Sequence, residues 1–245
     1  MSAPWRVQLS VLAARYRART LADWKTGLLL VAQAPFIGWL CTLAWGSIET
    51  DTPSLYFVLG LAALWFGCIG ACREVVKDRR IIERERLFGL SASAWVLSRY
   101  PVLAAIGMAQ VVLLVGAVEW QIGMKGALPL QVLALWGASL CGTGLGLLVS
   151  GLSSTQERAV GAIPLLILPQ ILFSEFAIPR RLFGDTMRAI EAAMPVSWCY
   201  DVFAELAASQ TSWSAVAADL LVLGGIAMGL AGMAILVVRI TREST

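Results

Sequence analysis

The sequence contains no histidine among its 245 residues. Histidine is the commonest general base near neutral pH and the commonest metal ligand in proteins. The chain also lacks a GxSxG nucleophile elbow, an HExxH metal motif and an acidic pair set in a recognisable reaction motif. These absences argue against an enzyme, and the sequence predicts neither a catalytic residue nor a metal site.

A GxxxxGK[ST] phosphate loop is also missing, which excludes ATP binding in the manner of the P-loop proteins. The net charge is only +3, so the composition predicts no nucleic-acid partner. Cysteine is scarce, and four of the five cysteines (Cys41, Cys68, Cys72 and Cys141) lie in apolar runs. The fifth, Cys199, lies in a more polar region, where a free thiol is expected and a bridge to a partner subunit is the alternative.

Apolar residues make up 58% of the chain, and charged residues only 14%. Several apolar runs approach the roughly 20 residues that a helix needs to cross a bilayer. The sequence therefore predicts an all-α integral membrane protein that forms one membrane domain over residues 1–245. Six transmembrane helices are expected, at residues 27–45, 54–72, 101–118, 128–150, 159–173 and 216–238.

The segment 73–91, REVVKDRRIIERERLFGLS, is the most densely charged part of the chain and lies between two apolar runs. The pairs Glu74/Lys77 and Arg79/Glu83 have the spacing that supports a helix. A segment this polar cannot lie in lipid and must therefore face solvent. The residues alone leave two readings open, namely a docking element for a soluble partner and a solvated loop that only joins two spans.

Two further segments have the pattern of helices at the membrane surface. Within residues 4–24, Trp5, Leu9, Leu12 and Tyr16 share one helical face, and arginines supply positive charge, which predicts an amphipathic interfacial helix. The long connection 174–214 is too polar to span. It contains a second apolar face, formed by Phe183, Met187, Ile190 and Met194, and then the aromatic residues Trp198, Tyr200 and Phe203, which are expected at the interface.

The distribution of basic residues predicts the orientation. Of the 19 Lys and Arg residues, fifteen lie in the N-terminal segment, in 73–100, in the 151–158 loop or after the last span, where Arg239 and Arg242 follow. The opposite loops hold only four, and the first of these loops carries Glu49 and Asp51 instead. The positive-inside rule therefore places both termini and the charged segment in the cytoplasm, in a multi-pass protein of the inner (plasma) membrane, with 174–213 outside.

Four stretches together resemble the permease of ABC-2 type exporters, specifically the ABCG-like (type V) membrane domain. They are the amphipathic helix 4–24, EVVKDRRIIERERLFGLSASAWVLSRYP (Glu74–Pro101), GLSSTQERAVGAIPLLILPQILFSEFAIP (Gly151–Pro179) and MPVSWCYDVF (Met194–Phe203). The resemblance implies an N-terminal elbow helix, a cytoplasmic coupling helix between the second and third spans, and external re-entrant or interfacial helices between the fifth and sixth.

The resemblance also implies roles for individual residues. The coupling helix would meet a separate ABC ATPase subunit, which would bind ATP and Mg²⁺, through Arg79, Arg80, Glu83, Arg84, Glu85, Arg86 and Phe88. The second and fifth spans would line the substrate pathway, with Phe66, Ile167, Leu172 and Phe173 as candidate contacts. A second permease copy or a paralogue would complete the pathway among membrane lipids, and the glycine faces of the fourth and last spans, Gly225 and Gly229 included, would assist packing.

One position departs from the family pattern. Glu175 stands where the family usually has glycine, just after the second proline of the fifth span. The carboxylate could bind a cationic group, form an external gate with Arg180 or Arg181, or remain solvated. The chain also lacks the ATP-binding domain of many relatives, which suggests either a separate permease subunit or the membrane part of a longer chain.

The predicted spans hold almost no ionisable residue, so ion-coupled transport is not expected. We instead expect transport to be coupled to an external energy source. We therefore expect a permease that moves a hydrophobic or amphipathic substrate, such as a lipid or lipid-linked molecule, out of the cytoplasm or the inner leaflet. The alternative is a non-transporting anchor that tethers an ABC ATPase to regulate or remodel an envelope complex. A membrane enzyme is disfavoured because no ionisable cluster in the spans could perform acid–base work.

Overall fold

The computed structural model describes residues 3–48 and 53–240, so the predicted positions Glu49, Asp51 and Arg242 lie outside the described residues. The regular elements in these ranges are helices. They are α1 (Trp5–Ala22), α2 (Trp24–Trp45), α3 (Pro53–Ala71), α4 (Glu74–Leu87), α5 (Ala92–Leu97), α6 (Tyr100–Glu119), α7 (Leu128–Leu152), α8 (Gln156–Gly161), α9 (Ile163–Leu172), the 3-10 turn η1 (Arg180–Leu182), α10 (Asp185–Glu191), α11 (Pro195–Ala207) and α12 (Trp213–Ile240).

Five helical stretches of the described chain are long and apolar enough to cross a membrane, namely Trp24–Trp45, Pro53–Leu87, Ala92–Glu119, Leu128–Leu152 and Trp213–Ile240. They contain α2, α3, α6, α7 and α12, and with them five of the six predicted spans. The all-α membrane architecture is thus confirmed.

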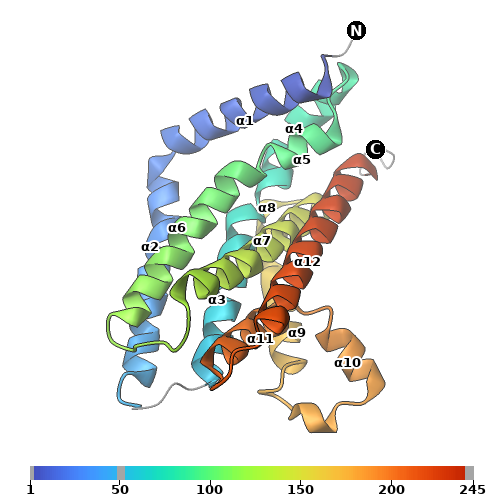
Figure 1. Cartoon of the computed structure of the whole chain (residues 1–245). Coiled ribbons are helices and arrows are strands. Elements are labelled where there is room, and N and C mark those ends of the chain that lie inside the picture. Colours follow the sequence, from blue (N-terminus) through green and yellow to red (C-terminus); the bar gives the residue numbers. More distant parts are fainter. Residues whose placement is uncertain (1–2, 49–52, 241–245) are drawn as a thin grey trace.

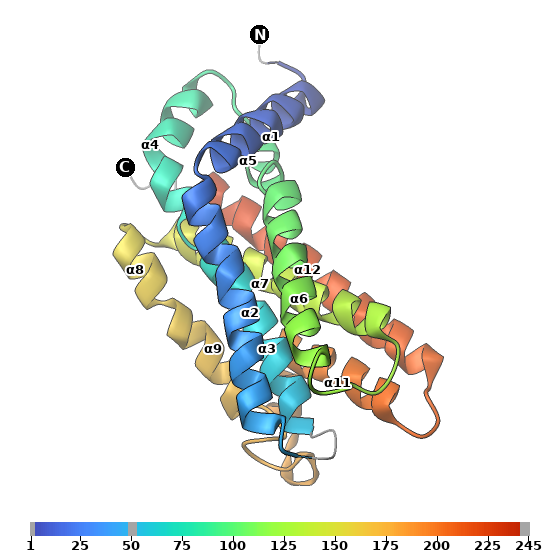
Figure 2. The same cartoon turned by 90° about the vertical axis from the view of Figure 1, so that its left-hand side faces the viewer.

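The predicted span 159–173 corresponds to α8 and α9, which follow one another along the side of the bundle (Figure 2). Neither helix alone is long enough, since the ten residues of α9 extend for about 15 Å at 1.5 Å per residue. Pro164 and Pro169 both lie in α9, and proline removes a backbone donor and disfavours a continuous helix. Only the pair of helices could approach the thickness of a bilayer.

The two ends of the bundle carry different elements. Figure 1 shows α1, α4, α5 and the C-terminal end of α12 at one end, and α10 and α11 at the opposite end. The same arrangement follows from five long helices and the α8–α9 pair running alternately up and down. The elements rich in arginine therefore meet at one end of the molecule.

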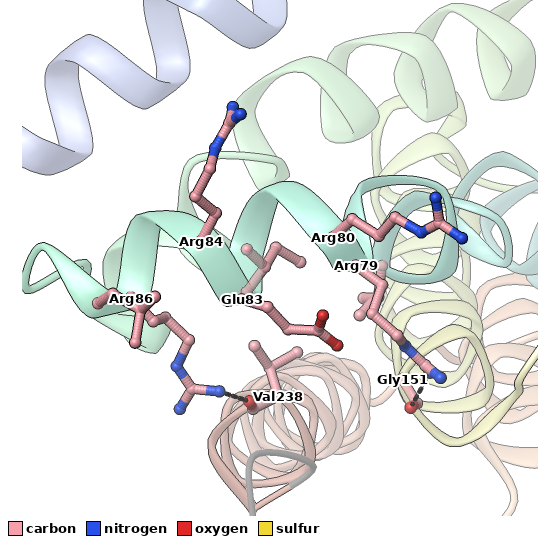
Figure 3. Close-up of a pocket in the computed structure, with 10 residues that line it drawn as sticks. Arg79, Arg80, Glu83, Arg84, Arg86, Gly151 and Val238 are labelled. Atoms are coloured by element: carbon pink, nitrogen blue, oxygen red, sulfur yellow. Dashed lines mark hydrogen bonds between the residues drawn. The ribbon is translucent and has the colours of Figure 1, made fainter. Parts of the chain in front are cut away.

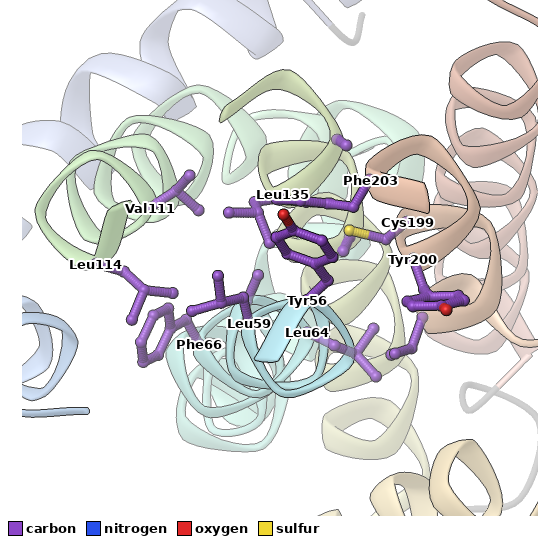
Figure 4. Close-up of a cluster of buried hydrophobic side chains, with 14 of the residues drawn as sticks. Tyr56, Leu59, Leu64, Phe66, Val111, Leu114, Leu135, Cys199, Tyr200 and Phe203 are labelled. Carbon is purple, nitrogen blue, oxygen red and sulfur yellow. The ribbon is translucent and has the colours of Figure 1, made fainter. Parts of the chain in front are cut away.

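The helices α3 and α7 form the centre of the bundle and approach each other closely. A methyl group added at Gly142 would overlap the carbonyl oxygen of Leu64, and one added at Gly67 would overlap that of Ser139. The predicted glycine face of the fourth span is thus used for packing within the chain. Around this contact, large apolar side chains such as Leu64, Phe66 and Leu135 fill the core (Figure 4).

The helix α11 packs against α3 and α12, so two of the three aromatic residues predicted at the interface are turned into the protein. Phe203 is completely buried, with its ring centroid 5.0 Å from that of Tyr56, and Tyr200 is also buried. Only Trp198 is half-buried. The Cys199 thiol is free and buried beside Gly60, so the alternative of an exposed cysteine that bridges to a partner is wrong for this conformation.

The two predicted amphipathic faces have different outcomes. In α1 the face is confirmed in part: Leu12 and Tyr16 are buried, but they pack against the protein beside α5 and not into lipid. The second face is shorter than expected, because α10 extends only from Asp185 to Glu191. Phe183, buried, and Met194, half-buried, lie outside that helix.

Candidate functional site

The first turn of the candidate coupling helix α4 is hydrogen-bonded to a polar side chain of α7. The Ser150 hydroxyl accepts hydrogen bonds from the backbone N–H groups of Val75 at 2.9 Å and Val76 at 3.0 Å. The first N–H groups of a helix have no partner within it, so this serine satisfies donors at the start of α4. Val75 and Ile82 are buried on the same side of α4, so the helix is fixed to the bundle along its length.

Two arginines of α4 bind the C-terminal ends of other helices (Figure 3). Arg79 donates from Nη2 to the carbonyl oxygens of Gly151 at 3.0 Å and Ser153 at 2.6 Å, at the end of α7. Arg86 donates to the carbonyl oxygens of Val238 at 2.7 Å and Arg239 at 3.0 Å, near the end of α12. The last carbonyls of a helix lack partners and carry partial negative charge, so both guanidinium groups act as caps.

Two carboxylates of α4 bind the N-terminal helix. Glu85 forms a bidentate pair with Arg15 at 2.6 and 3.1 Å, and Asp78 pairs with Arg19 at 2.7 Å. These hydrogen bonds raise the pKa of Arg15 and of Arg19 against the opposing effect of burial. Thus α1 and α4 are joined at two points.

The buried carboxylate of Asp78 also binds Arg99, just before α6, at 2.9 Å. The guanidinium carbon of Arg99 lies 4.3 Å from the ring centroid of Tyr16 and 4.2 Å from that of Trp95, so the cation is placed between two aromatic rings. Asp78 and Arg99 were not among the predicted site residues. Asp78 lies in the charged segment and Arg99 lies next to Tyr100, but nothing local in the sequence indicates that the two side chains pair.

Five exposed side chains, four on α4 and one just after it, form one face. Arg80, Glu83, Arg84, Leu87 and Phe88 are exposed and follow the spacing i, i+3, i+4, i+7 and i+8, which places them on one side of a helix. We call these five residues the outer face. Leu87 and Phe88 are 80% and 82% exposed. Bulky apolar side chains exposed next to charged ones are typical of an interaction surface.

The structure therefore divides the predicted coupling residues into two groups. Arg80, Glu83, Arg84 and Phe88 lie on the outer face and are available to a partner, as is Leu87, which the prediction did not include. Arg79, Glu85 and Arg86 instead bind other parts of the same chain. The helical spacing of 80, 83, 84, 87 and 88 could have revealed this face, but the internal partners of the other three could not be read from the sequence.

The predicted external pair of Glu175 and Arg180 is present as part of a larger cluster. Arg180 Nε lies 3.5 Å from Glu175 and 2.7 Å from Glu191, and its terminal nitrogens bind Asp201 at 2.8 and 2.9 Å. Burial lowers the pKa of Arg180, but the hydrogen bonds that Arg180 donates to Asp201 and Glu191 outweigh it and hold the pKa above its ordinary value. Glu191 and Asp201 were missed, because residues 11 and 21 positions apart from Arg180 have no local signal.

The predicted pathway residues have very different exposure. Phe66 is 1% exposed and Ile167 is 9% exposed, so in this conformation neither offers surface to a substrate. Phe173 is half-buried, whereas Leu172 is 57% exposed. Leu172 continues a row of exposed leucines on α9 formed with Leu165 and Leu168.

A family model for the ABC-2 type transporter matches residues 7–207, which is most of the chain. The match begins within α1 and ends at the last residue of α11, so it includes α4 and the cluster around Arg180. Among curated proteins, no sequence matches this chain.

Proposed function

Since the chain belongs to the ABC-2 type transporter family, we propose that it is the permease subunit of an exporter driven by a separate ABC ATPase. The ATPase subunit would bind ATP and Mg²⁺. The permease would lie in the inner (plasma) membrane with both termini in the cytoplasm, an orientation supported by the gathering of α1, α4 and the end of α12 at one end of the bundle (Figure 1).

The observation that carries the proposal is the outer face of α4. Its five side chains combine two arginines and a glutamate with two apolar residues that remain almost fully exposed. Arginine and large apolar residues are enriched among the side chains that dominate binding energy in protein interfaces. A soluble ATPase with a complementary groove would bury Leu87 and Phe88 and pair with Arg80 and Arg84.

The contacts on the opposite side of α4 explain how a push on this face would reach the membrane. Arg79 links α4 to the end of α7, Arg86 links it to the end of α12, and Glu85 links it to α1. Each link is a hydrogen bond from or to a charged group, and such bonds are stronger than neutral ones. ATP-driven motion of the partner would thus move α4 together with three other helices.

The pathway would be completed by a second permease copy or a paralogue. The exposed row of Leu165, Leu168 and Leu172 on α9 would form one apolar wall of that pathway. Such a surface suits a hydrophobic or amphipathic substrate, such as a lipid or lipid-linked molecule, because apolar groups gain by leaving water. Leu172 is the pathway candidate best placed to contact the substrate.

The test removes the apolar tip of the outer face. The double variant Leu87→Ser/Phe88→Ser should weaken co-purification of the ATPase by at least about tenfold, as expected for two central interface residues. Arg17→Gln is a matched control, because Arg17 is exposed on α1 at the same end of the molecule. Normal co-purification and normal ATP-driven transport by the double variant would refute the proposal.

A second substitution separates a transporter from an anchor. Leu172→Asn places a polar group in the proposed pathway, far in sequence from α4, and should abolish transport while the ATPase still co-purifies. A non-transporting anchor would tolerate this change. Wild-type transport with Leu172→Asn would show that α9 does not line the pathway.

A further inference from the structure

A cleft of about 490 Å³ lies beneath α4, between that helix and the C-terminal ends of α7 and α12 (Figure 3). We call it the basic cleft. Its lining residues are Val75, Arg79, Arg80, Ile82, Glu83, Arg84, Arg86, Leu87, Gly151 and Val238. Four of these residues, Arg80, Glu83, Arg84 and Leu87, also belong to the outer face, so the cleft opens directly beside the surface proposed for the ATPase.

The charge of the basic cleft favours an anion. Four arginines line it, and Glu83 is the one carboxylate among its lining residues in the described part of the chain. Arg79 donates its two hydrogen bonds from Nη2 to neutral carbonyl oxygens, so no carboxylate neutralises it there. Arg80 and Arg84 are exposed at the rim. Guanidinium groups bind phosphate oxygens with matching geometry, so a phosphate is the anion that this lining suits.

The other side of the cleft is apolar. Val75, Ile82, Leu87 and Val238 supply aliphatic surface next to the arginines. On α12, Val238 faces the cleft, whereas Leu236 and Ile240, with exposed fractions of 52% and 62%, lie about 160° round the helix from it. In a transmembrane helix such residues face lipid tails. A molecule with a phosphate and an acyl chain could place its headgroup beside the arginines and the start of its chain against the aliphatic lining of the cleft.

We propose that the basic cleft binds the phosphate headgroup of an anionic membrane lipid. Basic pockets at the cytoplasmic ends of transmembrane helices are suited to such headgroups, because the inner leaflet is rich in anionic lipid. The bound lipid bridges α4 to the ends of α7 and α12 and holds the coupling helix at the height of the membrane surface. The inference rests on the proposed orientation, with α4 at the cytoplasmic surface of the membrane, and does not depend on the ATPase or on the transported substrate.

The direct test measures lipid binding to the purified full-length chain in neutral detergent. Native mass spectrometry would compare the binding of phosphatidylglycerol with that of phosphatidylcholine carrying the same acyl chains. Wild-type protein should retain phosphatidylglycerol preferentially. The double variant Arg80→Gln/Arg84→Gln should lose about 25-fold in affinity, since each basic residue near a membrane surface contributes about fivefold. Arg17→Gln should bind as wild type does.

A variant with the opposite sign protects the test against simple misfolding. Glu83→Gln removes the negative charge from the lining and should strengthen phosphatidylglycerol binding by about fivefold. A general loss of structure would weaken binding and could not strengthen it. Unchanged or weaker binding by a Glu83→Gln protein that remains monodisperse would contradict the proposal.

Competition with inorganic phosphate identifies the source of the anion. If the site binds lipid, millimolar inorganic phosphate should displace little phosphatidylglycerol, because it lacks the apolar part. Equal binding of the two lipids, or full displacement by inorganic phosphate, would overturn the lipid assignment. Because no ATPase is present, failure here leaves the docking proposal intact, and failure of the docking test leaves this one intact.

Discussion

Asp78 and Arg99 form an ion pair of 2.9 Å whose side chains are only 5% and 3% exposed. The same carboxylate binds Arg19 of α1 at 2.7 Å, so one aspartate joins α1, α4 and the start of α6. The rings of Tyr16 and Trp95, with centroids 4.3 and 4.2 Å from the Arg99 guanidinium carbon, further stabilise the buried cation.

The first prediction concerns this pair. Asp78→Asn would leave Arg99 buried without its counter-ion, and breaking such a pair by removing one partner costs about 3–5 kcal/mol. We expect the unfolding midpoint in detergent to fall by roughly 10 °C. Arg17→Gln, at an exposed position of α1, is the control, with an expected change within about 0.5 kcal/mol. An Asp78→Asn protein as stable as wild type would show that the pair does not hold these helices together.

The second prediction concerns the close contact of α3 and α7. Gly142→Ala would place a methyl group against the Leu64 carbonyl, so the helices would have to separate, at a cost of about 1–3 kcal/mol. Gly225→Ala on α12 is the matched control, because nothing lies within 4 Å of the added methyl group. Alanine is the better helix former, so the control should be neutral or stabilised. Thermal unfolding of the two variants side by side would decide, and equal midpoints would contradict the packing argument.

The third prediction concerns the ion-pair cluster that Arg180 forms with Glu175, Glu191 and Asp201. Arg180→Gln removes the cation that binds Glu191 and Asp201, so the connection between α9 and α11 should open more often. Because Arg180 is 39% exposed, we expect an effect of only about 1 kcal/mol, or about fivefold faster hydrogen exchange of the backbone in 174–194. Arg181→Gln removes an exposed neighbouring charge and should leave the exchange unchanged. Equal exchange in the two variants would mean that the cluster does not hold this segment.

The fourth prediction concerns the orientation in the membrane. All five native cysteines are buried, so they should not react in a labelling experiment. In intact cells, a membrane-impermeant maleimide should not label the wild-type chain, because Cys199 is covered by α3. Ser209→Cys, just after α11, should be labelled from outside. Ser154→Cys, between α7 and α8, should be labelled only after the membrane is permeabilised. The reverse pattern would invert the proposed orientation.

Some features could be predicted from sequence because their cause is local. Long apolar runs mark α2, α3, α6, α7 and α12, since a helix in lipid must satisfy its own backbone. The charged segment gave the position of α4 for the same reason, because charge cannot remain in the hydrocarbon. The glycines of the fourth span indicated close packing, but not that α3 would be the neighbour.

Other features depend on residues far apart in the chain. The sequence alone determined an all-helical membrane domain and predicted a cytoplasmic or external side for each loop, because hydropathy and charge act residue by residue. Only the tertiary structure decided that Arg79, Glu85 and Arg86 bind the chain itself while Arg80, Arg84, Leu87 and Phe88 face outward. The reason is physical: the capped carbonyls and the paired arginines come from α7, α12 and α1, and a helix acquires an inner and an outer side only when those neighbours pack against it.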